Sequence, residues 1–217
     1  MKEHLYKLLE LLDIKNESTS ILCLIIIVIL NINSQIMTKC YYEIIKISKL
    51  FPPQKNENKF IYGKLCEKAL IIAMQNIGLN CIDLDNNHKV GSEYKNDIKL
   101  ENKDFSIKTK LNKGGDIIMI NKKSKTTHSL VINTIICSIN EGKLYFIPSN
   151  IFNIEKYFKV DAGTISYKGS LLTLMNKEYK QYIYTFPNLS VYHKNELDII
   201  KEVDIYNILY KEYIKVK

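Results

Sequence analysis

The stretch DIKLENKDFSIKTK, residues 97–110, decides the fold that we expect for this chain. Ile98 and Leu100 alternate with polar residues before its polar centre, and Phe105 and Ile107 do the same after it. Alternation with a period of two on both sides of a polar centre predicts a β-hairpin with one buried face. The hairpin would form part of a larger sheet, because an isolated hairpin is marginal in water.

A two-residue turn at Asn102-Lys103 sets the register that we expect for this hairpin. The facing pairs across the two strands would be Leu100 with Phe105, Lys99 with Ser106, Ile98 with Ile107, and Asp97 with Lys108. One face of the hairpin would be wholly apolar. The other face would gather four polar side chains, those of Asp97, Lys99, Ser106 and Lys108.

Helices are expected on the N-terminal side of the hairpin. Residues 63–78 have a helical apolar pattern that ends at Gly78. Residues 21–30 are ten apolar residues without a break, whereas a membrane span needs about 20. This run favours a buried helix with Asn16 or Ser18 as its N-cap. We expect no stable membrane association, although membrane contact by this run remains the alternative.

The fold class that we expect is α/β (α+β), with one mixed central sheet flanked by helices. Residues 1–52 would form a helical subdomain, and the proline-containing segment 51–56 would link it to a second domain, 53–217. The predicted strands are 80–84, 117–120, 129–139 and 143–147, with weaker ones at 171–175 and 182–186. A helix is predicted at 196–213.

The composition excludes several classes of protein. Hydrophobic residues make up 46% and charged residues 25%, which is ordinary globular usage and not that of a disordered chain. All 31 basic residues are lysine, a usage that fits an AT-rich genome. The net charge of +8 still favours a polyanionic partner. Five cysteines without a CxxC motif argue against disulfides and zinc, and favour a cytoplasmic location. No P-loop and no GxGxxG motif is present.

Asp97 and Lys108 have the relation that metal-dependent phosphodiester hydrolysis requires. An acid at the start of one strand and a lysine on the same face of its neighbour place a metal ligand close to an ammonium group. Carboxylate oxygens hold Mg²⁺, and the positive charge offsets the charge that develops on the phosphate. The alternative is a plain cross-strand ion pair, worth roughly 0.2–1 kcal/mol.

A family pattern contains the same residues. Glu67 on a preceding helix, Asp97 opening the hairpin and Ser106-Ile107-Lys108 on its second strand resemble the PD-(D/E)xK nuclease core. That core is a helix, a three-stranded meander, and then a further helix and strand. The segment FSIKTKLNKGG resembles type II restriction endonucleases that carry Ser-x-Lys in place of Glu-x-Lys. The resemblance covers roughly residues 63–150, and it makes 53–217 a nuclease-like catalytic and DNA-binding domain.

The resemblance implies a Mg²⁺-dependent endonuclease that cuts double-stranded DNA, with a homodimer for symmetric cleavage. Asp97 would bind the metal, Lys108 would orient the attacking water, and Ser106 would take the usual glutamate position. A hydroxyl is a poor ligand, so another carboxylate must complete the metal site. Glu67 is the first candidate and Asp116 the second, although Glu67 could be an exposed helix residue and Asp116 could simply follow a turn.

DNA contacts are expected from residues within and after the hairpin, namely Lys110, Asn112, Lys113, Asn121, Lys122 and Lys123. The alternative for these lysines is an ordinary solvated surface. Four features depart from the family pattern. Asn96 replaces the proline before Asp97, Ser106 replaces the acid, no helix is evident between the Ile107 strand and the Val131 strand, and no arginine is available to contact guanine. A non-catalytic nucleic-acid-binding accessory protein is therefore the alternative function.

Overall fold

A computed structural model describes residues 18–50, 56–84, 96–111, 115–121, 133–151, 157–161 and 164–187 of the chain. The predicted linker at 51–56, apart from its last residue, and the predicted helix at 196–213 lie outside these ranges. The boundary between a 1–52 subdomain and the rest therefore stays a prediction. Within the described ranges the N-terminal helices and the central sheet share one hydrophobic core.

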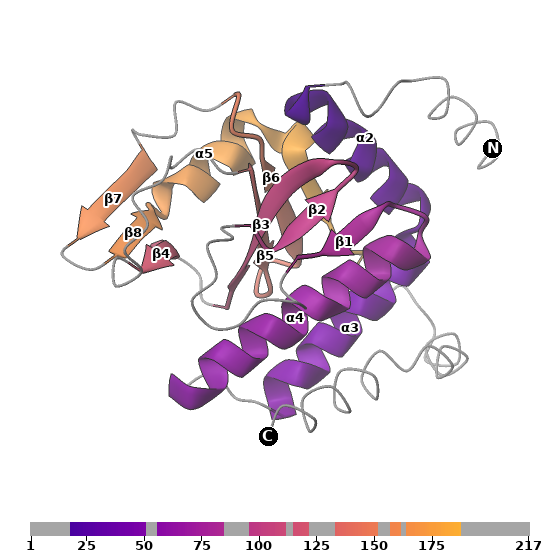
Figure 1. Ribbon diagram of the computed structural model, residues 1–217, viewed down its shortest axis with the longest axis horizontal. Helices are drawn as coiled ribbons and strands as arrows, with labels where there is room; N and C mark the ends of the chain where they lie inside the picture. The colour runs from indigo at the N-terminus through magenta and orange to yellow at the C-terminus, as the bar shows by residue number, and fades with distance from the viewer. Residues whose placement is uncertain are drawn as a thin grey trace.

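A six-stranded mixed sheet forms the centre of the fold (Figure 1). Its strands, in spatial order, are β1 (Cys81–Asp83), β2 (Ile98–Leu100), β3 (Lys103–Lys110), β5 (Asn133–Ser138), β6 (Lys143–Ile147) and β9 (Ile183–Thr185). Strands β3 and β5 are parallel, and the other neighbouring pairs are antiparallel. The predicted class, a mixed sheet flanked by helices, is confirmed. The order α4, β1, β2, β3 matches the helix and three-stranded meander that the nuclease resemblance implies, whereas the further helix expected before β5 is not among the described residues.

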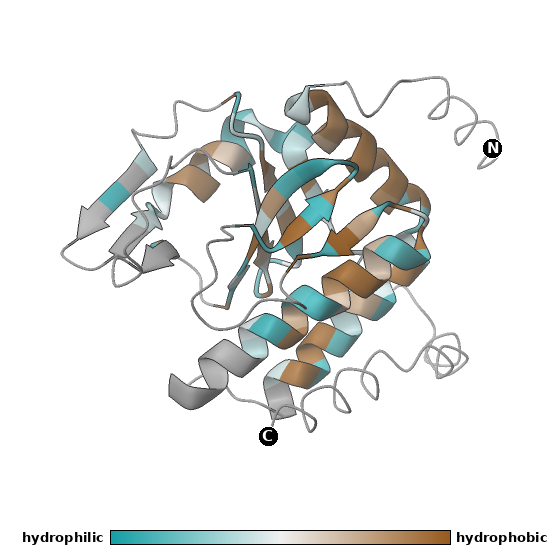
Figure 2. Cartoon of the chain, viewed as in Figure 1, coloured by the Kyte–Doolittle hydropathy of each residue, from teal (hydrophilic) through white to brown (hydrophobic). Residues whose placement is uncertain are grey.

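Among the described residues, three helices precede the sheet, namely α2 (Thr19–Ile32), α3 (Ser34–Leu50) and α4 (Asn56–Asn76). Helix α4 contacts α3 on one side and strands β1 and β3 on the other, while α2 contacts β9. Figure 2 shows hydrophobic stretches along all three helices. Helix α4 begins earlier than the predicted residue 63, because a glycine inside a helix is only a modest penalty and Gly63 does not end it. Gly78, at φ 87°, lies just beyond its C-terminal end, as predicted.

The apolar run 21–30 lies within α2, and most of its side chains are buried. Ser18, one of the two predicted N-caps, is the N-cap of α2. Its hydroxyl accepts a hydrogen bond from the backbone N–H of Ile21 at 3.5 Å. No single helix among the described residues is long and apolar enough to cross a membrane. The pair α2–α3, bent by 89°, passes that test by length and composition alone.

Two predictions about the C-terminal half are wrong. Residues 171–175 were expected to form a strand but lie in helix α5 (Ser170–Glu178), because Leu171, Leu172 and Met175 share one buried helical face. A single sheet was expected, but a second, three-stranded antiparallel sheet is present. It consists of β4 (Ile117–Asn121), β8 (Thr164–Tyr167) and β7 (Phe158–Asp161). The predicted strand 182–186 is confirmed as β9, which follows a short 3₁₀ helix, η3 (Lys180–Tyr182).

The hairpin register differs from the prediction by two residues. Its turn is Glu101-Asn102, both with positive φ (47° and 67°), so that Ile98 faces Phe105. Positive φ at both central residues is the geometry of a type I′ turn, whose twist suits a two-residue hairpin. A shift by an even number of residues leaves every side chain on its predicted face. The apolar face and the polar face of the hairpin are therefore as predicted.

Candidate active site

The backbone around Asp97 is fixed by two neighbouring strands. Its N–H donates to the carbonyl oxygen of Phe105 at 3.0 Å, and its own carbonyl oxygen accepts from the N–H of Leu84 at 3.1 Å. These bonds connect Asp97 to β3 on one side and to the end of β1 on the other. The meander therefore sets the position of the side chain before any ligand is present.

The carboxylate of Asp97 points to the polar face and collects three donors on Oδ2. The Ser106 hydroxyl donates at 2.7 Å and the backbone N–H of Ile107 at 2.6 Å, and the Lys108 ammonium lies at 3.4 Å. Carboxylate and ammonium therefore meet on one face of the sheet, as the hairpin pattern predicted. The side chains of Lys108 and Asp97 are 25% and 19% exposed, so the pair remains open to a ligand from solvent.

Glu67 brings a second carboxylate to the same place from α4. It is buried, with 5% of its surface exposed, and both of its carboxylate oxygens accept from the Lys64 ammonium at 3.4 Å. Burial and the negative charge of Asp97 raise the pKa of Glu67 to about 7, while Lys64 and Lys108 oppose that rise. The predicted partner acid of Asp97 therefore lies near it, not on an exposed helix face.

Asp116, the other candidate acid, has different surroundings. Its carboxylate accepts from the N–H of Gly169 at 3.2 Å and lies 3.8 Å from the Lys159 ammonium of the second sheet. Within the described ranges, no three Asp, Glu, His or Cys side chains form a group that could hold a metal ion. The structure therefore brings Glu67 together with Asp97, but not Asp116.

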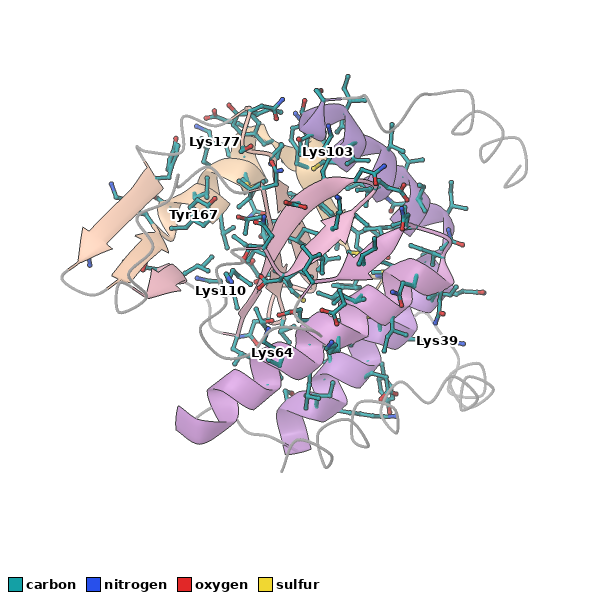
Figure 3. All side chains as sticks on the ribbon, in the orientation of Figure 1. Lys39, Lys64, Lys103, Lys110, Tyr167 and Lys177 are labelled. Carbon is teal, nitrogen blue, oxygen red and sulfur yellow. The ribbon has the colours of Figure 1, made fainter. Side chains whose placement is uncertain are left out.

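Lys110, a predicted DNA contact, is largely enclosed by the protein in this structure. Lys110, labelled in Figure 3, is only 9% exposed. Its ammonium donates to the carbonyl oxygen of Gly115 at 2.7 Å. Burial lowers its pKa, while the nearby carboxylates of Glu141 and Asp116 raise it. Lys110 therefore ties Gly115, which lies just before β4, to the end of β3.

The other predicted DNA contacts fall largely outside the described residues. These are Asn112, Lys113, Lys122 and Lys123. Asn121 ends strand β4, but its side chain lies outside the described part. Their roles stay predictions.

Comparison with known proteins identifies no family for this chain. No protein-family model and no curated protein matches it. A solved structure described as a restriction endonuclease in complex with substrate DNA is similar to this chain. The similarity covers 58% of this chain and 69% of the chain in that structure. The identity is 16% and the TM-score 0.40. A likeness this weak supports no inference, so the function must be inferred from the geometry of the site.

Two contacts of the site were missed from the sequence. Lys64 precedes Glu67 by three residues, so the helical spacing alone could have indicated the contact between them. The hydrogen bond from the Ile107 N–H to Asp97 had no such signal, because it depends on where the β2–β3 ladder ends. A sequence pattern therefore indicates which face of a strand a side chain lies on, but not where the hydrogen bonds between two strands end.

Proposed function

We propose that this chain is a Mg²⁺-dependent endonuclease that hydrolyses phosphodiester bonds of double-stranded DNA in the manner of a type II restriction enzyme. The observation that carries the proposal is the 3.4 Å contact between Lys108 and Asp97, with the buried Glu67 close enough to Asp97 to have its pKa raised by it. Two neighbouring carboxylates, one partly exposed and one buried, with an ammonium beside them are what metal-assisted phosphoryl hydrolysis needs.

The donor set fits a magnesium ion. Mg²⁺ keeps several of its waters and is commonly bound by one or two carboxylates together with substrate phosphate oxygens. Asp97 and Glu67 supply two carboxylates, and repulsion between their negative charges contributes to the raised pKa of Glu67. A divalent cation relieves such repulsion. When bound, it would polarise the phosphate and lower the pKa of a water molecule.

The remaining chemistry belongs to the side chains. Lys108 would hold the attacking water near the phosphorus and would offset the negative charge as one ester oxygen leaves. Ser106 would keep Asp97 in place through its 2.7 Å hydrogen bond without serving as a ligand. We further propose a homodimer acting at a specific sequence, because symmetric cleavage of a duplex needs two sites related by a twofold axis.

A second function is favoured by one observation. Three donors already satisfy Asp97 Oδ2, so the same arrangement could serve only to close the β2–β3 ladder. Ser106 at the usual position of the acid fits such a protein equally well. In that case the chain would be a non-catalytic nucleic-acid-binding accessory protein.

The experiment compares two substitutions at Asp97. Asp97→Asn keeps an oxygen for the Ile107 N–H but removes the negative charge, whereas Asp97→Ala removes both. Purified protein is incubated with a panel of plasmid and genomic DNAs, with Mg²⁺ or with EDTA. The proposal expects discrete fragments from the wild type with Mg²⁺, and none with EDTA or from either variant.

The matched control is Asp104→Asn, an exposed acid of the same hairpin that contacts Asn96. It should cut like the wild type. Salt-sensitive DNA binding by the wild type without cleavage would reject the enzyme and favour the accessory protein. Cleavage by Asp97→Asn at the wild-type rate would reject the assignment of the metal site.

A further inference from the structure

Lys64 contacts the buried acid of the site. Its ammonium lies 3.4 Å from each carboxylate oxygen of Glu67. It therefore contacts both atoms that a metal ion would use. The two side chains differ in exposure: that of Lys64 is 32% exposed, while that of Glu67 is 7% exposed. Lys64 therefore extends from solvent towards a buried carboxylate.

The spacing on α4 makes this contact a property of the helix. Residues three apart lie on the same side of a helix, one turn from each other. Because α4 packs against β1 and β3, Glu67 is held near enough to Asp97 for that carboxylate to raise its pKa. Lys64 lies one turn closer to the N-terminus, where α4 passes the lower part of the sheet as viewed in Figure 3.

We propose that Lys64 is a positioning residue that sets the magnesium affinity of the site by acting as the counter-ion of Glu67 when no metal is bound. This inference rests on the proposed function. A metal ion that uses Glu67 must displace the ammonium from the carboxylate oxygens and then remain close to a positive charge. Both requirements weaken binding, so Lys64 raises the magnesium concentration at which the site fills.

Long flexible side chains suit this role. A lysine ammonium is a compact charge on a stem with four carbons, and it can move to water once its partner is occupied. Lys108 is placed differently, because it lies on the central strand β3 and contacts Asp97, whose other donors come from the same strand. The two lysines would therefore have separate tasks, one at each carboxylate.

The test measures binding of Mg²⁺ alone, by titration calorimetry without DNA, to the full chain and three variants. Lys64→Gln removes the charge and keeps a polar side chain. It should bind Mg²⁺ roughly tenfold more tightly than the wild type, the effect of one unit charge about 6 Å from a divalent ion at the dielectric constant of water. Lys64→Arg keeps the charge and should retain the wild-type affinity.

The matched control is Lys68→Gln, one turn further along α4. Lys68 pairs with Asp83 of β1, so its substitution changes the net charge equally and leaves both contacts between Lys64 and Glu67 in place. An unchanged or weaker affinity of Lys64→Gln would overturn the inference, and so would equal tightening by Lys68→Gln. If neither the wild type nor any variant binds Mg²⁺, the metal site itself fails and the proposed function with it. Wild-type binding that Lys64→Gln leaves unchanged removes only the role of Lys64.

Discussion

Glu67→Gln is expected to make the metal-free protein more stable, and increasingly so as the pH rises. Burial and Asp97 raise the pKa of Glu67 from 4.5 to about 7. A raised pKa in the folded state means that the fold favours the protonated carboxyl. The wild type therefore has its full stability below pH 4.5 and loses part of it as the pH rises through 7.

The size of the effect follows from the shift. Each pKa unit corresponds to about 1.4 kcal/mol, so the deprotonated carboxylate destabilises the fold by up to about 3 kcal/mol above pH 7. Glutamine cannot ionise and escapes this penalty. For a chain of this size, 1 kcal/mol shifts the melting temperature by roughly 2–4 °C. The melting temperature of the variant minus that of the wild type should therefore be roughly 6–12 °C larger at pH 8 than at pH 4.

Thermal and urea unfolding of both proteins in EDTA at a series of pH values between about 4 and 8 measure this difference. The slope with pH is diagnostic, because the introduced amide adds a pH-independent cost if its N–H groups lack partners. Glu178→Gln, an exposed glutamate on α5, is the control and should show no such slope. Two results would refute the argument that the burial of Glu67 outweighs its pairing with Lys64: a difference that is constant with pH, or a wild type that becomes more stable than the variant at alkaline pH.

Substitutions at three further positions test the site and the hairpin. Lys108→Gln should lower cleavage by about 100-fold or more, as expected when a general acid–base or charge-stabilising group is lost, while changing the free energy of unfolding by less than about 1 kcal/mol. Ser106→Ala loses one hydrogen bond to Asp97 and should cost about 0.5–1.5 kcal/mol in urea unfolding, yet it should retain cleavage within about tenfold of the wild type. Asn102→Val should lower the free energy of unfolding by about 1–2 kcal/mol because φ is positive at that position, whereas Asn102→Gly should leave it almost unchanged. Equal stability of the two variants in urea unfolding would contradict the type I′ turn.

The faces of the hairpin could be predicted from the sequence, but its register could not. Alternation reports only whether a side chain points up or down, and this is unchanged when a register shifts by two residues. The turn was misplaced because glutamate is an uncommon residue at positive φ, so Glu101 gave no turn signal. Asp97 and Lys108 still meet, because a lysine side chain can reach a diagonal neighbour across two strands.

The second sheet and α5 were harder to predict for a physical reason. Strands of three to five residues carry too few alternations to stand out, and β7 and β8 have four residues each. In α5, Leu171, Leu172 and Met175 make a short apolar run, and such a run fits a buried strand as well as one helical face. The crossover between the parallel strands β3 and β5 is required by geometry, and a strand within it was predicted at 117–120. That this strand pairs with β8 in a second sheet was not predicted.

Asp97 shows why the structural and catalytic interpretations of the site do not exclude each other. Its carboxylate accepts the Ile107 N–H at the point where the β2–β3 ladder ends, so the strand itself holds the acid in place. A ligand held by the sheet is preorganised, and preorganisation is what a metal site requires of its first acid. In the described part of the chain, Glu67 instead takes its hydrogen bonds from Lys64, a flexible and partly exposed side chain on a helix. If the site binds magnesium, any adjustment should therefore occur on α4, with Lys64 leaving Glu67, while Asp97 and its three donors stay where they are.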